Sequence, residues 1–149
     1  MHIRPYRPGD ADPLLAIFRK NIPESFGQNE IDAYATFLPV NTDPYFVAEY
    51  EGEVAGACGY YLIREGNVAR ICWILADPYR RGSGVGSALL RHVLNQISTH
   101  PAVNLIECET SQVAYRFFEK FDFTLHYAKP DHWAPGLDLY FMSREPKGV

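Results

Sequence analysis

A glycine-rich turn at residues 82–86 constrains the fold of this chain more than any other stretch. Residues 68–75 before it are mostly apolar and β-prone. The segment after it has apolar residues at helical spacing, namely Leu90, Val93, Leu94 and Ile97. Glycines at such a strand-to-helix junction leave backbone N–H groups uncovered, and the start of the helix adds a partial positive charge. The turn therefore predicts an anion site suited to phosphate, with the charge of Arg81 beside it.

Two nucleotide-binding motifs fit this turn poorly. A phosphate-binding P-loop has Lys and then Ser or Thr after its last glycine, whereas Gly86 is followed by Ser87 and Ala88. A dinucleotide fingerprint would have its third glycine at position 87, which is Ser. A turn that needs only positive φ is the simplest alternative, but three alternating glycines exceed what a tight turn requires. A nucleotide-binding α/β domain is therefore a disfavoured alternative.

The spacing Arg81-x-x-Gly84-x-Gly86, after a strand and before an amphipathic helix, resembles the acyl-CoA signature of the GNAT superfamily of N-acyltransferases. A second stretch resembles the later motif of that superfamily, Asn-x-x-Ala-x-x-Phe-Tyr-Glu-Lys-x-Gly-Phe. In this chain it reads Ser111-x-x-Ala114-x-x-Phe117-Phe118-Glu119-Lys120-Phe121-Asp122-Phe123. The chain departs from the pattern at Ser111, Phe118 and Asp122, which replace Asn, Tyr and Gly.

The order of the expected elements also resembles that superfamily. It is a strand, two helices, three strands, a helix, a strand, a helix and two strands. A helix is expected to begin at Asp12-Pro13, a second to end at Pro39, and a short third one to start near Ser111. Residues 45–50 and 53–63 form an expected hairpin, and residues 128–136 an expected loop. The resemblance implies an α/β (α+β) fold in one domain, residues 1–149, with a mixed, mostly antiparallel sheet of about six to seven strands flanked by about four helices.

Length and composition suit this interpretation. A chain of 149 residues with 47% apolar and 21% charged residues is typical of one globular domain. The net charge of −4 disfavours a nucleic-acid partner, and no apolar run is long enough to span a membrane. No signal-peptide core is present, and the odd number of cysteines, Cys58, Cys72 and Cys108, suggests free thiols in a reducing cytoplasm.

The resemblance implies a site for acetyl-CoA, with no metal. Its pantetheine arm would contact the backbone of Ile74, Leu75 and Ala76, and a main-chain N–H there would polarise the thioester carbonyl. Further residues are implied to bind the cofactor. From the glycine turn these are Arg81, Gly82, Ser83, Gly84, Val85, Gly86 and Ser87, and from the later motif Ser111, Ala114, Phe117 and Phe118.

Proton transfer is the part of the chemistry that the sequence leaves open. Many relatives have a tyrosine acid where this chain has Phe118, and Tyr115, one turn earlier but about 60° around the helix, is a candidate replacement. An ordinary aromatic on the helix surface is the favoured interpretation of Tyr115, and the alternative for the chemistry is that the thiolate of CoA leaves unassisted. Glu24 and Glu107 are candidate bases that remove the proton of the amine, and His132 and Trp133 lie in a late loop that would cap the acceptor.

The function implied is transfer of an acetyl group from acetyl-CoA to a primary amine of a small molecule or peptide, by direct attack in a ternary complex. The alternative is a non-catalytic acyl-CoA sensor with the same fold, which the absence of the tyrosine favours. Exposed edge strands are compatible with a homodimer. Fold resemblance does not identify the acceptor.

Overall fold

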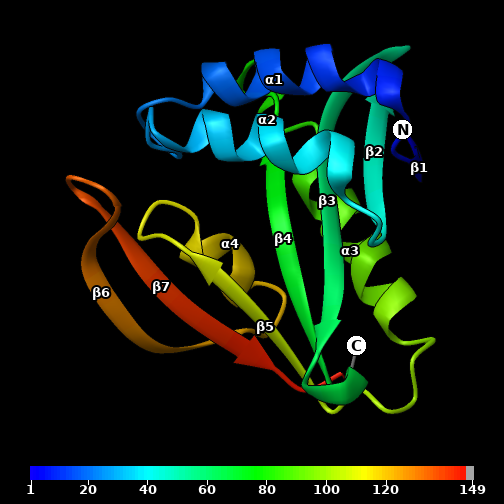
Figure 1. Ribbon diagram of the computed structural model, residues 1–149, viewed down its shortest axis with the longest axis vertical. Coiled ribbons are helices and arrows are strands. Elements are labelled where there is room, and N and C mark those ends of the chain that lie inside the picture. Colours follow the sequence, from blue (N-terminus) through cyan, green and yellow to red (C-terminus); the bar gives the residue numbers. More distant parts are fainter. Residues whose placement is uncertain (147–149) are drawn as a thin grey trace.

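The computed structural model describes residues 1–146 and places a seven-stranded sheet at the centre of the molecule (Figure 1). The strand order is β1-β2-β3-β4-β5-β7-β6. The strands are β1 (His2–Pro5), β2 (Tyr45–Tyr50), β3 (Glu53–Ile63), β4 (Val68–Ala76), β5 (Leu105–Thr110), β6 (Thr124–Ala134) and β7 (Leu137–Arg144). The α-helices are α1 (Ala11–Lys20), α2 (Glu30–Val40), α3 (Val85–Ile97) and α4 (Tyr115–Glu119). The expected fold class is confirmed.

All neighbouring strands are antiparallel except β4 and β5, which are parallel. Because β-strand side chains alternate between faces, the sheet divides its apolar residues between two cores. Phe46 and Ala48 of β2 pack in the core beneath α3, whereas Tyr45 and Val47 pack in the core beneath α1 and α2. The sheet is therefore covered by helices on both faces.

Three expected boundaries differ from the structure. The first helix begins at Ala11, so Pro13 lies inside its first turn, and Pro39 lies within α2 because that helix continues to Val40. The short helix expected near Ser111 begins at Tyr115. These differences are small, since helix ends commonly shift by one or two residues or begin with a turn.

The expectation of a loop at residues 128–136 is wrong, because most of this segment belongs to the edge strand β6. Pro130 prompted the expectation, since proline cannot donate to a sheet ladder. In the structure the pairing of β6 with β7 is interrupted between Lys129 and Ala134, and Pro130 lies in that interruption. An irregular edge strand accepts proline where a central strand does not.

A bulge in β4 is the local feature that shapes the site. Gly59 of β3 pairs with Cys72 and Ala57 with Leu75, so that two β4 residues, Trp73 and Ile74, lie opposite one β3 residue. Trp73 has a φ of 42°, which is a strained conformation for a large side chain. Its carbonyl accepts a hydrogen bond of 2.7 Å from the hydroxyl of Tyr45. The bulge is thus held by a buried side chain of β2.

Candidate active site

β4 and β5 separate partway along their length, which opens the sheet (Figure 1). They pair only where residues 68–70 face residues 105–107. Beyond this point β4 continues to Ala76 along β3, while β5 continues to Thr110 along β7. Two cavities lie along the separated strand ends, and both are lined by Ser25, Phe26 and Ile74. The cavities therefore meet at these three residues.

The first cavity is a groove of about 590 Å³ beside the glycine-rich turn, called the turn groove below. Most residues that the sequence assigns to the cofactor line it, namely Ile74, Leu75, Ala76, Arg81, Gly82, Gly84, Val85, Gly86, Ser87 and Phe117. Ser83 and Ala114 do not line it. Ser111 and Phe118 line the second cavity instead. The structure thus brings the turn, the end of β4 and one residue of α4 together.

The first turn of α3 presents backbone donors to the turn groove. Gly84 precedes the helix with a φ of 84°, a left-handed conformation that favours glycine. The N–H of Ala88 makes the first intrahelical bond, to the carbonyl of Gly84, so the N–H groups of Val85, Gly86 and Ser87 have no helical acceptor. No acidic residue lies in this turn. It is suited to a phosphate group.

The two arginines of the turn have different surroundings. Arg80 bonds Glu51 and Glu53 at 3.3 and 3.0 Å, which ties the turn to the β2–β3 hairpin. Arg81 is 72% exposed, and its ion pair with Glu24 is long, at 3.5 Å, with Glu24 itself 76% exposed. An exposed pair of this kind holds its charges weakly. Arg81 is therefore free to bind an anion, and Glu24 lines neither cavity.

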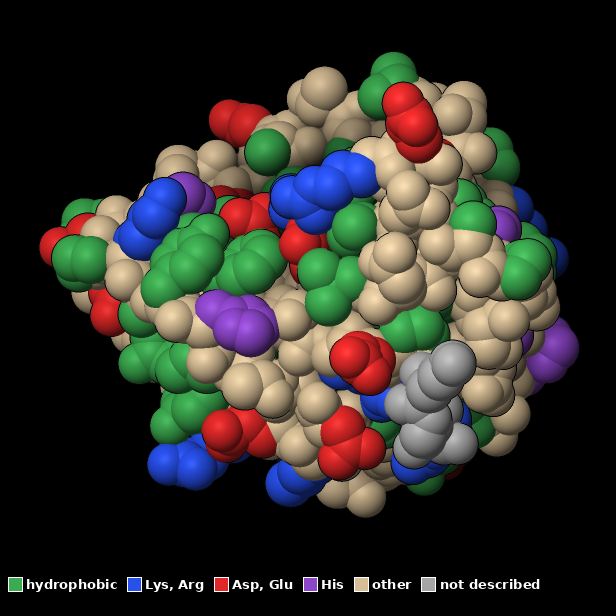
Figure 2. Space-filling view, turned by 90° about the horizontal axis from the view of Figure 1, so that it is seen from below, with side chains coloured by type: hydrophobic (Ala, Val, Ile, Leu, Met, Phe, Trp, Pro, Cys, Tyr) green, Lys and Arg blue, Asp and Glu red, His purple; other side chains and the backbone are tan. Residues whose placement is uncertain are grey.

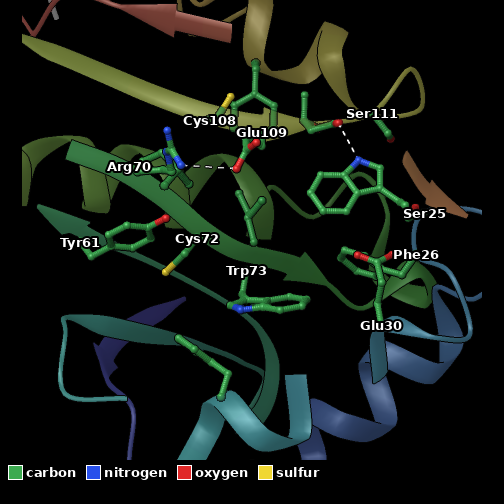
Figure 3. A pocket seen from close by; sticks show the side chains of 16 residues that line it. Ser25, Phe26, Glu30, Tyr61, Arg70, Cys72, Trp73, Cys108, Glu109 and Ser111 are labelled. Atoms are coloured by element: carbon green, nitrogen blue, oxygen red, sulfur yellow. Dashed lines mark hydrogen bonds and ion pairs between the residues drawn. The ribbon is translucent and has the colours of Figure 1, made fainter. Parts of the chain in front are cut away.

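The second cavity, called the β4–β5 cavity below, has a volume of about 300 Å³ (Figure 3). Its walls are largely aromatic, with the rings of Phe26, Phe37, Tyr61, Trp73, Phe118 and Trp133. Its charged lining residues are Glu30, Arg70 and Glu109. In Figure 3, Arg70 and Glu109 lie at one end and Glu30 lies at the other with Ser25 and Phe26, while Trp73 lies between the two ends.

The loop between α1 and α2 closes one end of the β4–β5 cavity. Asn21 donates hydrogen bonds to the carbonyls of Ile17 and Ala76, which anchors the loop to β4. Gly27 lies against the end of β6, where an added Cβ would stand 2.8 Å from the Cβ of Ala134. Since such a distance is too short for two carbons, the loop can approach β6 this closely only with glycine at this position.

Glu30, the first residue of α2, directly follows that loop in the chain. Its Oε2 accepts a 2.7 Å hydrogen bond from the N–H of Gly27. Burial raises the pKa of Glu30, although this hydrogen bond and the charge of His132 act in the opposite direction. Among residues 1–146 it forms no ion pair. Glu30 is not among the bases expected from the sequence.

Glu107, a candidate base from the sequence, lies beneath two arginines. It is bonded by Arg70 at 2.7 Å and by Arg64 at 3.0 Å. Burial alone would raise the pKa of Glu107, but the hydrogen bonds from the two arginines lower it. It does not line the β4–β5 cavity, whereas Glu109 does and lies 3.5 Å from Arg70. Glu107, with its lowered pKa, is therefore a weak base and is well suited to holding Arg70 in place.

Tyr115, the candidate acid, lines neither cavity. Its ring packs against Tyr140, with ring centroids 4.9 Å apart, and the guanidinium of Arg116 lies over it. Phe118 is almost fully buried and contacts Phe123. Trp133 lines the β4–β5 cavity and donates its indole N–H to the carbonyl of Thr110, whereas His132 does not line it.

Cys72 and Cys108 also line the β4–β5 cavity, and both are free thiols. Burial raises the pKa of Cys72 to about 12 and also raises that of Cys108. A nucleophilic cysteine needs a lowered pKa. The cavity therefore disfavours an acyl-cysteine intermediate. Among residues 1–146, no group of three or more His, Cys, Asp or Glu side chains is arranged to hold a metal ion.

Glu30, Arg70 and Glu109 were missed because their placement depends on contacts between distant segments. Arg70 carried a signal, since it is a charged residue in an otherwise apolar strand. Glu109 follows Glu107 by two residues and so shares its side of the strand in an alternating pattern. Glu30 carried none, because an acidic residue in the first turn of a helix is ordinary.

Comparison with protein families identifies this architecture. The model of the acetyltransferase (GNAT) family matches residues 12–123, which include the separated strands, the turn and α4. The chain belongs to this family. As a GNAT protein it is an acyl-CoA-dependent N-acyltransferase. A comparison with curated protein sequences finds no match.

Solved acetyltransferase structures have a similar fold over nearly the whole chain. A GNAT-family protein from Desulfovibrio desulfuricans is 21% identical with a TM-score of 0.81, covering 97% of this chain and 98% of that one. An aminoglycoside 6'-N-acetyltransferase complexed with coenzyme A is 14% identical with a TM-score of 0.79, covering 100% and 99%. A Salmonella typhimurium protein solved with its cofactor acetyl-CoA is 17% identical with a TM-score of 0.77, covering 100% and 95%. In residues 1–146 no helix has the length and apolar character that a membrane crossing needs.

Proposed function

We propose that this GNAT protein transfers an acetyl group from acetyl-CoA to a primary amine of a small molecule or peptide. The observation that carries the proposal is the meeting of the two cavities at Ser25, Phe26 and Ile74. One cavity has free backbone N–H groups and an arginine suited to phosphate, and the other has aromatic walls and carboxylates. A thioester held at the junction would lie between a nucleotide-binding groove and an acceptor cavity.

Acetyl-CoA fits the turn groove through three kinds of contact. The N–H groups of Val85 to Ser87 and the guanidinium of Arg81 supply donors for the pyrophosphate. The exposed end of β4 supplies backbone groups for the pantetheine arm, at Ile74, Leu75 and Ala76. A main-chain N–H that donates to the thioester oxygen would stabilise the tetrahedral intermediate by about 3 kcal/mol. Two of the similar structures were solved with coenzyme A or acetyl-CoA, which supports this ligand.

The reaction would proceed by direct attack of the amine in a ternary complex. The nitrogen forms a bond to the thioester carbonyl carbon, and the C–S bond then breaks to release the thiolate of CoA. The high pKa values of Cys72 and Cys108 disfavour a covalent detour. Phe118 cannot donate a proton, and Tyr115 lies outside both cavities, so we propose that the thiolate leaves without an acid from α4.

Calorimetric titration with acetyl-CoA tests this proposal, with NAD and ATP as controls. We expect micromolar binding of acetyl-CoA alone, followed by amine-dependent release of the CoA thiol. A sensor that binds acyl-CoA without turnover would give the binding but no thiol release with any amine, and Phe118→Tyr would not change that result. Absence of acetyl-CoA binding would contradict the proposal itself.

We also propose a cytoplasmic location and a homodimer. The three free cysteines suit a reducing compartment. β6 is one of the two edge strands of the sheet, and Leu125 and Tyr127 are 37% and 45% exposed on it. Figure 2 shows hydrophobic side chains gathered on that side of the molecule. Sedimentation of the wild type and of Tyr127→Lys would test the dimer, and a wild type that sediments as a monomer would contradict it.

A further inference from the structure

The two ends of the β4–β5 cavity differ in their relation to the turn groove. Ser25, Phe26 and Ile74 line both cavities, so their end is where an amine would meet the thioester. Figure 3 places Glu30 beside Ser25 and Phe26, and places Tyr61 and Arg70 at the opposite end. An acceptor would therefore have its reactive nitrogen near Glu30 and the rest of its body toward Arg70.

The walls between these ends favour a flat, apolar body. Trp73, Phe37 and Trp133 contribute ring surfaces to a volume of about 300 Å³. The side chain of Trp73 is fixed, because its ring packs against Phe18 and Tyr34 in the core. Aromatic faces bind both flat apolar groups and cations.

The charges in the cavity favour a cation over an anion. Arg70 is shared between Glu107 and Glu109, at 2.7 and 3.5 Å, so that its charge is already neutralised. Glu30 has no cationic partner among residues 1–146, apart from the field of His132. A carboxylate on the acceptor would meet the like charges of Glu30 and Glu109. Within the described part of the chain, Arg70 keeps one buried N–H, at Nε, without a partner, but it offers no net positive charge to attract an anion. An ammonium on the acceptor would supply the positive charge that is missing beside Glu30.

We propose that the acceptor is a primary amine on an aromatic body without a carboxylate, and that Glu30 binds its ammonium and takes its proton. This inference rests on the proposed acetyl transfer, because it assigns the acceptor and the base of that reaction. The other candidate carboxylates are less suited. Glu24 lies outside the cavity and pairs with Arg81. Glu107 forms ion pairs with Arg64 and Arg70. Glu109 forms an ion pair with Arg70 at the far end of the cavity.

Each proton that the amine loses in this reaction has a named acceptor. The ammonium gives one proton to the carboxylate of Glu30, which leaves a neutral amine to attack the thioester. The nitrogen of the tetrahedral intermediate then carries a proton that passes to the departing thiolate, and Glu30 releases its own proton to solvent. The net reaction forms the amide and free CoA and releases one proton.

The surroundings of Glu30 fit this role. Its Oε2 is held by the N–H of Gly27, which leaves Oε1 free to meet the amine. Burial raises the pKa of its carboxyl, which makes it a better base, and the apolar walls disfavour the charged form of the amine. His132 of β6 is the titratable group whose charge reaches Glu30, while the loop between α1 and α2 and strand β4 line the same cavity with apolar side chains such as Phe26 and Trp73.

The test compares Glu30→Gln with the control Asp32→Asn, which changes an exposed carboxylate in the same helical turn. The glutamine keeps an oxygen that can accept from Gly27. We expect Glu30→Gln to lower kcat by about 100-fold, a typical contribution of a general base. The acidic limb of the pH–rate profile should disappear in Glu30→Gln and remain in Asp32→Asn and in His132→Gln. The affinity of each variant for acetyl-CoA should stay within twofold of the wild-type value. An unchanged kcat and pH profile would overturn the role of Glu30.

Matched amines test the substrate class. Tyramine and phenethylamine should release CoA thiol with a kcat/KM at least tenfold higher than tyrosine and phenylalanine, which add a carboxylate, and than putrescine, which lacks a ring. Equal or better use of the amino acids or putrescine, or no thiol release with either aromatic amine, would overturn the proposal. An acetyl-CoA titration on the same preparation separates the two levels, because failure to bind acetyl-CoA would contradict the proposed function as well.

Discussion

The hydroxyl of Tyr45 holds the bulge of β4, and its removal gives a stability change that can be worked out from the structure. It donates to the carbonyl of Trp73 at 2.7 Å and lies 2.8 Å from the hydroxyl of Tyr34. Since the proton of Tyr45 is used by Trp73, Tyr34 donates to Tyr45. Both tyrosines are buried, which raises the pKa of each phenol. The pair is thus a short chain of neutral hydrogen bonds.

The two hydroxyls should contribute unequally. Tyr45→Phe leaves the Trp73 carbonyl and the Tyr34 hydroxyl unpaired, and each buried unpaired group costs about 1–3 kcal/mol. The expected loss in the free energy of unfolding is therefore about 2–6 kcal/mol. Tyr34→Phe leaves the bond to Trp73 intact and removes one neutral hydrogen bond, with an expected loss of about 1 kcal/mol.

Denaturant unfolding of the two single variants and of the double variant measures these losses. The double variant should lose less than the sum of the single variants, because the hydroxyl of Tyr34 that Tyr45→Phe leaves unpaired is absent from it. In a chain of this size each kcal/mol corresponds to about 2–4 °C in Tm. Equal losses for Tyr34→Phe and Tyr45→Phe, or strict additivity, would refute the assignment of Tyr45 as the bridge between Tyr34 and the bulge.

Three further predictions concern the turn groove and the buried charges. Arg81→Ala should weaken acetyl-CoA binding by about 1–3 kcal/mol in calorimetry if Arg81 bonds a phosphate, whereas unchanged affinity would remove it from the site. Gly86→Val should abolish acetyl-CoA binding, because the added methyl groups would enter the turn groove. Its Tm should change little, because the added Cβ would contact only the ring of Phe117, at 3.5 Å. Retained acetyl-CoA binding would contradict the assignment of the turn groove as the cofactor site. Glu107, with its pKa lowered in the folded state, stabilises the fold above the pKa of about 4.3 that it has when unfolded, and this stability is lost as the pH falls through the folded pKa. Glu107→Gln should therefore unfold more easily at neutral pH and show a shallower loss of stability below about pH 4.3, and an unchanged acid titration would contradict the ion pairs.

The sequence predicted the parts of the site that depend on local patterns. The glycine turn, the strand before it and the helix after it have strong local signals, and the structure places most of the residues implied for the cofactor in one groove. The role of these residues stays a prediction until acetyl-CoA binding is measured. The fold class was implied by the resemblance of the motifs and of the element order to the GNAT superfamily, and it is confirmed by the sheet and by the family match.

The β4–β5 cavity could not be predicted in the same way, because it depends on contacts between segments far apart in the chain. The bulge at Trp73, with its positive φ, is bonded by a buried donor from β2, and no local pattern predicts a bulge at a tryptophan. Glu30 lines the cavity only because the loop at Gly27 lies against the end of β6. That end of β6 was itself expected to be a loop, because Pro130 is typical of a loop and the irregular pairing of an edge strand leaves no local pattern in the sequence.

Arg70 illustrates how charge is resolved by tertiary structure. A charged residue in the middle of β4 conflicts with a buried strand, and the conflict is removed by Glu107 and Glu109 on the parallel neighbour β5. The pairing also fixes the last point at which β4 and β5 lie side by side, since their register ends at Arg70 and Glu107. Arg70, together with Glu109, thus lies at the far end of the β4–β5 cavity.

Mass spectrometry of the product formed from acetyl-CoA and an aromatic primary amine tests the central claim most directly. The wild-type protein should convert tyramine to its N-acetyl derivative, with one free CoA released for each amide formed, and Gly86→Val should form none. Consumption of acetyl-CoA without an acetylated amine, or equal product from Gly86→Val, would contradict acetyl transfer at the junction of the two cavities.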